Sequence, residues 1–80
     1  MKTATIKIFG KDYSAEGETV KEALEKLPYS GLTMVKSFLT VKGDNYEKTI
    51  FLNPIQTKRF FAPNKLMKEI AIKQTAMRFE

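Results

Sequence analysis

The stretch GETVKEALEKLPYSG, residues 17–31, decides the fold because it places a short amphipathic helix between two strand-rich segments. Thr19 followed three residues later by Glu22 is typical of a capping box at a helix start. Glu22 and Lys26 form a favourably oriented i,i+4 pair, and Pro28 prevents the helix from continuing. The apolar residues at helical spacing share one face: Val20, Ala23, Leu24 and Leu27. The sequence therefore predicts a helix over residues 19–27.

A β-hairpin is predicted before this helix. Residues 3–9, TATIKIF, alternate between two faces, with Ala4, Ile6 and Ile8 on one of them, which is the period of a half-buried strand. Gly10-Lys11 suits a two-residue type II′ turn, which places glycine first. The return segment, DYSAE, directs Tyr13 and Ala15 to one side.

A second hairpin is predicted over residues 34–52. In MVKSFLTVK, one face carries Val35, Leu39 and Val41, and the other carries Lys36, Phe38, Thr40 and Lys42. Gly43-Asp44-Asn45 provides a short turn, and the segment YEKTIFL that follows it has strong strand propensity.

Two helices are predicted to complete the chain. Asn53-Pro54 is typical of an N-cap followed by proline at the first helical position, so PIQTKRFF starts a short helix that ends before Pro63. Asn64 then caps a final helix, KLMKEIAIKQTAMRF. Its predicted apolar stripe consists of Leu66, Met67, Ile70, Ala71 and Met77. The segment TKRFF becomes a corner between two helices, with at least one of Phe60 and Phe61 fixing that corner to the sheet.

The order β-β-α-β-β-α-α predicts an α+β fold with an antiparallel-rich sheet and its helices packed on one face. At 80 residues, the chain is expected to form a single small domain over residues 1–80.

Residues 3–52 resemble the β-grasp fold shared by ubiquitin and the bacterial sulfur-carrier proteins. The resemblance rests on the Ile6/Ile8 strand, the Gly10 turn and the helix from Thr19 to Leu27; residues 53–80 would be a helical C-terminal extension. It implies a fold and no function. Because the chain ends AMRFE and not in the Gly-Gly of those carriers, we do not expect its terminus to be activated by adenylation.

The composition argues against catalysis. The chain has no histidine and no cysteine, which removes the commonest general base, the commonest nucleophile and the usual zinc ligands. The glutamates near residue 20 suit ordinary helix-start chemistry, and KGDNYE, residues 42–47, suits a hairpin turn better than a calcium loop. We therefore expect no enzyme activity, catalytic residue, metal or cofactor. With no signal-like or membrane-spanning apolar run, we expect a soluble cytoplasmic protein without a membrane partner.

The net charge of +5 is uneven: residues 1–53 carry 8 lysines and 7 acids, whereas residues 54–80 carry 6 cations and 2 acids. A positive field at one end attracts anionic partners. The candidate contacts to an anionic partner or nucleic acid are Lys58, Arg59, Lys65, Lys68, Lys73 and Arg78.

Phe38 lies on the strand face opposite Val35, Leu39 and Val41. If those three residues face the core, another element or a ligand must shield the Phe38 ring from water. We favour cover by the C-terminal helix, with a protein partner or a single-stranded nucleic acid as the alternatives. The candidate interface residues are Phe38, Phe51, Ile72 and Phe79. The predicted function is that of a small non-enzymatic protein-interaction module, acting through its sheet face or C-terminal helix on another protein or a second copy. The alternative is nucleic-acid binding by the basic region 58–78.

Overall fold

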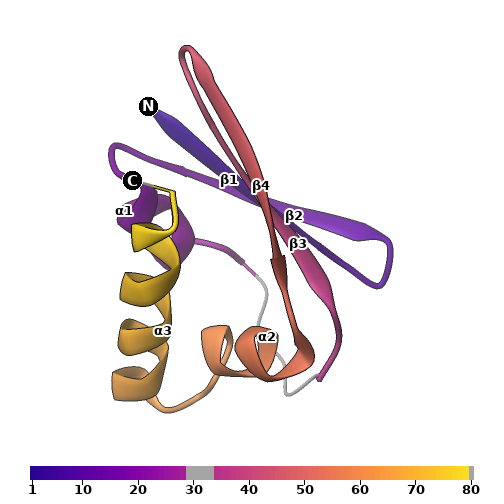
Figure 1. The fold of residues 1–80 in the computed structure, drawn as a ribbon. Coiled ribbons are helices and arrows are strands. Elements are labelled where there is room, and N and C mark those ends of the chain that lie inside the picture. Colours follow the sequence, from indigo (N-terminus) through magenta and orange to yellow (C-terminus); the bar gives the residue numbers. More distant parts are fainter. Residues whose placement is uncertain (29–33, 80) are drawn as a thin grey trace.

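The computed structural model describes residues 1–28 and 34–79, which form a four-stranded sheet and three helices (Figure 1). The last residues of the stretch 17–31 lie outside this described part. The elements are β1 (Lys2–Ile8), β2 (Lys11–Gly17), α1 (Val20–Glu25), β3 (Ser37–Gly43), β4 (Tyr46–Leu52), α2 (Pro54–Phe60) and α3 (Lys65–Met77). This order confirms the predicted α+β fold with the sequence β-β-α-β-β-α-α.

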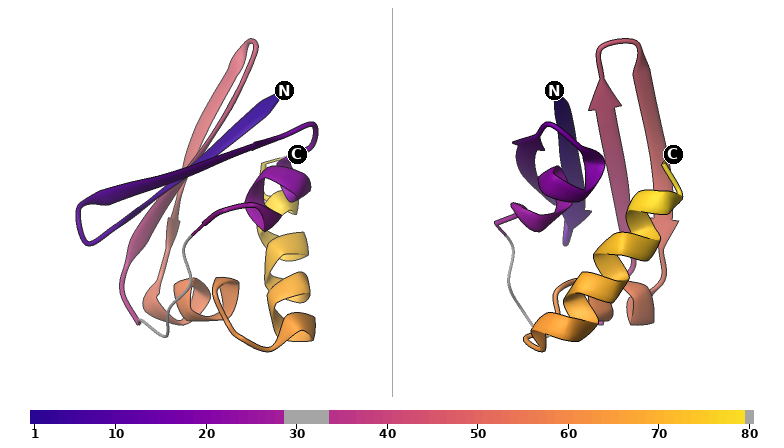
Figure 2. Two further views of the ribbon diagram at one scale, coloured as in Figure 1. Left: turned by 180° about the vertical axis from the view of Figure 1, so that it is seen from behind. Right: turned by 90° about the vertical axis from the view of Figure 1, so that its left-hand side faces the viewer.

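The sheet is antiparallel at every pairing, with the strand order β2-β1-β3-β4. Ile6 of β1 lies opposite Tyr13 of β2 and Leu39 of β3. Since β1 is antiparallel to both neighbours, β2 and β3 run in the same direction, and α1 forms part of the connection between them. Figure 2 shows all three helices on one side of the sheet, with α2 at the end where β3 begins and β4 finishes.

The core lies between this face and the helices. Inward-facing residues of β1, β3 and β4 pack with α1, with Phe60 and Phe61 at the end of α2, and with the inner side of α3. Alternation along β1 and β3 was predicted correctly, because strict polar–apolar alternation fixes which side chains share a face. The buried apolar cluster consists of Ala4, Ile6, Ile8, Val20, Ala23, Leu24, Leu27, Leu39, Val41, Ile50, Leu52, Phe60, Phe61, Ile72, Ala76 and Phe79.

The turn between β1 and β2 differs from the predicted one. The strands pair as far as Ile8 opposite Lys11, so the two-residue loop is Phe9-Gly10 and not Gly10-Lys11. Both loop residues have positive φ, 53° for Phe9 and 75° for Gly10, as a type I′ turn requires. Phe9 is strained by this conformation and is 75% exposed.

Helix α1 begins as predicted, at the N-cap Thr19, whose hydroxyl accepts a hydrogen bond from the Glu22 backbone N–H at 3.1 Å. The Glu22 carboxylate instead accepts a hydrogen bond from Lys26 Nζ at 3.0 Å. Thr19 therefore makes its half of the predicted capping box, whereas the Glu22 side chain makes the predicted i,i+4 pair with Lys26.

The large side chains of the apolar stripe predicted for α3 face outward. Leu66 and Met77 are 67% and 64% exposed, and Met67 and Ile70 are also exposed. The buried face instead carries Ile72, Thr75 and Ala76, followed by Phe79 just beyond the helix. This face packs because α3 lies against α1 and α2. Ile72 and Phe79 are therefore core residues and not the interface residues that the sequence predicted.

We expect Gly17→Ala to lower the free energy of unfolding by about 1–3 kcal/mol, because an added Cβ overpacks this site. That atom would lie 2.6 Å from the Ala23 backbone nitrogen. Urea denaturation followed by circular dichroism measures the loss. Gly43→Ala is the matched control: its Cβ would lie 3.3 Å from the flexible tip of Lys2. Equal losses in both variants would contradict the close packing of β2 on α1.

We expect Phe9→Asn to raise the free energy of unfolding by about 1 kcal/mol, because asparagine adopts positive φ more readily than a bulky residue. The same denaturation measurement tests this. Phe9→Ala keeps the Cβ and the strain, so it should show no comparable gain. A loss of stability in Phe9→Asn would mean that the ring makes stabilising contacts that outweigh the strain.

Candidate functional site

The six cations predicted to meet an anionic partner all lie on α2, on α3 or at the end of α3, but they do not form one surface. The three ion pairs found among residues 1–28 and 34–79 involve none of them. Lys65 and Lys68 line a hollow beside α1 that also contains Glu25 and Glu69. Lys73 is exposed on α3. Arg59 and Arg78, in contrast, line one hollow between α2 and α3.

Helix α2 is held at its start by a complete capping box. The Asn53 side chain accepts a hydrogen bond from the Gln56 backbone N–H at 2.8 Å, and Gln56 Oε1 accepts one from the Asn53 N–H at 3.0 Å. Pro54 occupies the first turn, as the sequence predicted. Because Oε1 of Gln56 is engaged by the cap, the amide NH₂ group is the end of this side chain that remains for a ligand.

The inner side of α2 is fixed in the core. The hydroxyls of Ser37 and Thr57 are 2.7 Å apart and both residues are 1% exposed. Phe60 and Phe61 are both buried, with ring centroids 4.9 Å apart in an edge-to-face arrangement. The two rings thus fix the end of α2 in the core, and the Arg59 side chain lies on the exposed side of this helix.

Helix α3 begins at Asn64, whose side chain accepts hydrogen bonds from the Leu66 and Met67 backbone N–H groups. Its C-terminal end is capped from the sheet. Lys48 Nζ donates to the carbonyl oxygen of Arg78 at 2.7 Å, and the Tyr46 hydroxyl donates to that of Phe79 at 2.7 Å. Two carbonyls beyond the helix end therefore already have donors other than the Arg78 guanidinium.

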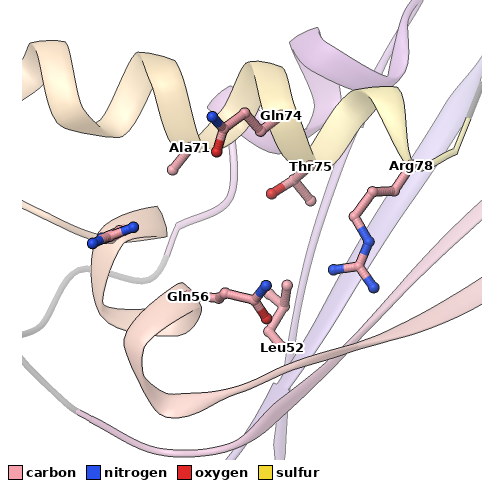
Figure 3. Close-up of a pocket in the computed structure, with 7 residues that line it drawn as sticks. Leu52, Gln56, Ala71, Gln74, Thr75 and Arg78 are labelled. Atoms are coloured by element: carbon pink, nitrogen blue, oxygen red, sulfur yellow. The ribbon is translucent and has the colours of Figure 1, made fainter.

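The hollow that the two arginines share has a volume of about 230 Å³ and is lined by Leu52, Gln56, Arg59, Ala71, Gln74, Thr75 and Arg78. Figure 3 shows Arg78 extending from the end of α3 toward β4, and Gln56 extending from α2 toward the same space. The lining holds two guanidinium groups, two primary amides and one hydroxyl. Among the residues that the structure describes, the lining includes no carboxylate, so its polar chemistry favours anions.

Two further hollows continue from the first. One, of about 180 Å³, is lined by Arg59, Met67, Ile70, Ala71 and Gln74; the other, of about 290 Å³, is lined by Met34, Ile55, Lys58, Arg59, Ala62 and Met67. Arg59 lines all three, which we call together the α2–α3 groove. Four large apolar residues along it are each about half exposed: Met34, Ile55, Met67 and Ile70.

Sequence reasoning missed much of this groove. Gln56, Gln74, Met34 and Ile55 were not assigned to a site. A usable signal exists, because Met67, Ala71, Gln74 and Arg78 recur at spacings of four, three and four residues and so share one side of a helix. The sequence analysis assigned Met67 and Ala71 to the apolar stripe and Arg78 to the candidate cations, and it did not combine them.

The face of the sheet away from the helices is a second exposed surface. Phe38 and Phe51 lie opposite one another on β3 and β4, with ring centroids 5.7 Å apart. They are 53% and 44% exposed, so the expectation that the C-terminal helix covers Phe38 is wrong. The helices pack on the other face, and alternation alone does not say which face is covered.

Polar residues surround these two rings in rows that cross all four strands. One row contains Ser14, Thr5, Thr40 and Thr49, in which the hydroxyls of two neighbouring pairs are 2.9 and 2.8 Å apart. The flanking rows contain Lys7 and Lys42 together with Asp12, Glu16 and Glu47. Together with Lys36, which the strand alternation places on the same face, three lysines meet three carboxylates, so this surface does not attract polyanions as the groove does.

None of the helices described is long and apolar enough to cross a membrane. Within residues 1–28 and 34–79, no group of three or more acidic residues could hold a metal ion. Comparison of the chain with known protein families, curated proteins and solved structures finds no match.

We expect Thr57→Val to lower the free energy of unfolding by about 1–3 kcal/mol, because it leaves the buried Ser37 hydroxyl without its partner. Chemical denaturation of the single variants and of the Ser37→Ala, Thr57→Val double variant measures the coupling. The double variant should cost less than the sum of the two single changes. Strict additivity would contradict the role of this pair in fixing α2.

Proposed function

We propose that the protein is a small interaction module whose α2–α3 groove binds an acidic, apolar segment of another protein. The observation that carries this proposal is the position of Arg59, which connects three hollows that combine exposed apolar side chains with arginine and lysine. A segment with both apolar and carboxylate side chains complements these two properties. Exposed apolar surface favours a protein partner, and the unpaired cations select its charge.

We propose binding without catalysis. The polar groups of the first hollow are guanidinium, amide and hydroxyl, and an arginine in a protein does not act as a proton acceptor. Such a set holds and orients an anion, but it offers no general base. The cysteine-free composition favours a reducing compartment, so we infer a cytoplasmic setting. The β-grasp-like order of elements adds no functional support, because unrelated functions share one fold.

The alternative is nucleic-acid binding by the basic region 58–78. The cations could contact phosphates, but binding of single strands also draws on stacking against aromatic rings. Phe60 and Phe61 are buried, and the exposed rings of Phe38 and Phe51 lie on the sheet face opposite the helices. A nucleic acid could therefore not meet both the groove and those rings along one short path. This separation supports the protein partner over the nucleic acid.

Selection of a random linear peptide library against the immobilised protein tests the proposal. We expect the selected peptides to contain Asp or Glu beside Leu, Ile or Phe. Met67→Gln should weaken their binding at least about tenfold, equivalent to ~1.4 kcal/mol, because it removes an apolar contact in the groove while keeping a helix-compatible side chain. Fluorescence anisotropy of a labelled selected peptide measures the change.

Phe38→Gln on the sheet face is the matched control and should leave peptide affinity within about twofold. If Phe38→Gln abolishes binding and Met67→Gln does not, the binding surface is the sheet face and the groove proposal is wrong. If no peptide is selected and labelled oligonucleotides bind with a steep salt dependence, the alternative replaces it. A dimer in light scattering that Met67→Gln converts to a monomer would identify a second copy as the occupant, in place of a foreign acidic segment.

A further inference from the structure

We propose that the hollow lined by Arg59, Arg78 and Gln56 is an oxyanion subsite that binds one carboxylate or phosphate group. The inference deepens the proposed function, and it rests on that function only for the source of the anion, a side chain of the partner segment. The subsite itself consists of side chains on α2 and α3, and simple ions can test binding there.

The two arginines have no ion-pair or side-chain hydrogen-bond partner in the described part of the chain. A cation near a helix C-terminus is often explained by the helix dipole, and Arg59 lies in the last turn of α2 while Arg78 is the C-cap of α3. At α3, however, Lys48 and Tyr46 already donate to the terminal carbonyls. The Arg78 guanidinium is thus not needed to cap these carbonyls, and it extends into the hollow (Figure 3).

The neighbouring groups are of the type that an oxyanion requires. A guanidinium presents a planar fork of N–H donors that fits the paired oxygens of a carboxylate or phosphate. Gln56 adds an amide NH₂ group, whose position is fixed because its Oε1 accepts the Asn53 N–H. The volume of about 230 Å³ exceeds many times the ~10–15 Å³ that one water molecule needs by the same measure, which is enough for such a group.

Among residues 1–28 and 34–79, internal competition for these donors is low. Glu25 and Glu69 line the hollow on the other side of α3, beside α1. Glu22, Glu25 and Glu47 are paired with Lys26, Lys21 and Lys42. Since Arg59 also lines the apolar hollow around Met67 and Ile55, the anion and an apolar side chain of the same partner segment would bind next to one another.

Titration of the isotope-labelled protein with inorganic phosphate and with succinate, followed by NMR, tests the subsite directly. We expect saturable shifts of the side-chain N–H signals of Arg59, Arg78 and Gln56. Arg78→Gln and Arg59→Gln should each weaken phosphate binding about fivefold or more. Lys73→Gln removes the same charge from the outward side of α3 and should change the affinity less than about twofold. Unchanged amide spectra elsewhere and circular dichroism establish that the variants are folded.

Equal weakening by Arg78→Gln and Lys73→Gln would overturn the subsite, because it would show a diffuse charge effect. So would shifts that do not saturate. These results decide the subsite whether or not any peptide is selected, so a failure of the proposed function leaves this test intact. Conversely, peptides that bind through Met67 but are insensitive to Arg78→Gln would retain the groove and reject the subsite.

The source of the anion is assigned with a selected peptide. Changing its acidic residue to the amide should weaken binding to the wild-type protein about tenfold and should have little further effect on Arg78→Gln, as coupling of the two groups requires. Phosphoserine at the same position then separates the sources. Tighter binding assigns the subsite to a phosphoryl group, and equal or weaker binding assigns it to a carboxylate. Independent, additive losses in the two changes would overturn the pairing of this residue with Arg78.

Discussion

The arrangement of the helical half depends on the burial of Phe60 and Phe61. Two adjacent residues at a helix end normally point about 100° apart, yet both rings are in the core and contact each other edge to face. Both are buried where α2 ends, with Phe60 as the last residue of the helix and Phe61 as its C-cap. The chain must then turn through Pro63 before α3 begins, which brings α3 back beside α2. The α2–α3 groove is a consequence of this corner.

The local structure could be predicted from the sequence because its signals are local. Asn53-Pro54 and Asn64 supply caps whose partners lie within three residues, and alternation in β1 and β3 fixes which side chains share a face. The positive φ of Phe9 was missed for an equally local reason: a glycine was assigned to the first loop position, and the register that extends to Ile8 and Lys11 places it second.

The tertiary assignments were less predictable, because they depend on which of two apolar faces another element covers. Helix α3 carries apolar residues on both sides, so its periodicity does not choose between the Leu66 side and the Ile72 side. The structure buries the side with Ala76, whose small side chain suits close packing of helices, and leaves Leu66, Met67 and Ile70 outward. Phe38 was misassigned for the same reason. Its face was correctly separated from that of Leu39, but the helices pack on the other one.

The two exposed surfaces differ in charge, and this difference separates their chemistry. On the sheet face, lysines and carboxylates alternate within the rows around Phe38 and Phe51, so their fields largely cancel within one Debye length. On α2 and α3 the cations have no ion-pair partners among the described residues, so their fields add and direct an approaching anion toward the helices. An acidic partner would therefore meet the helical side first, and the apolar side chains beside Arg59 would then determine whether it stays bound. The charges that attract an anion and the apolar side chains that would select it thus lie on the same side of the molecule. For this reason we propose the groove, rather than the more aromatic sheet face, as the docking surface for an anionic segment.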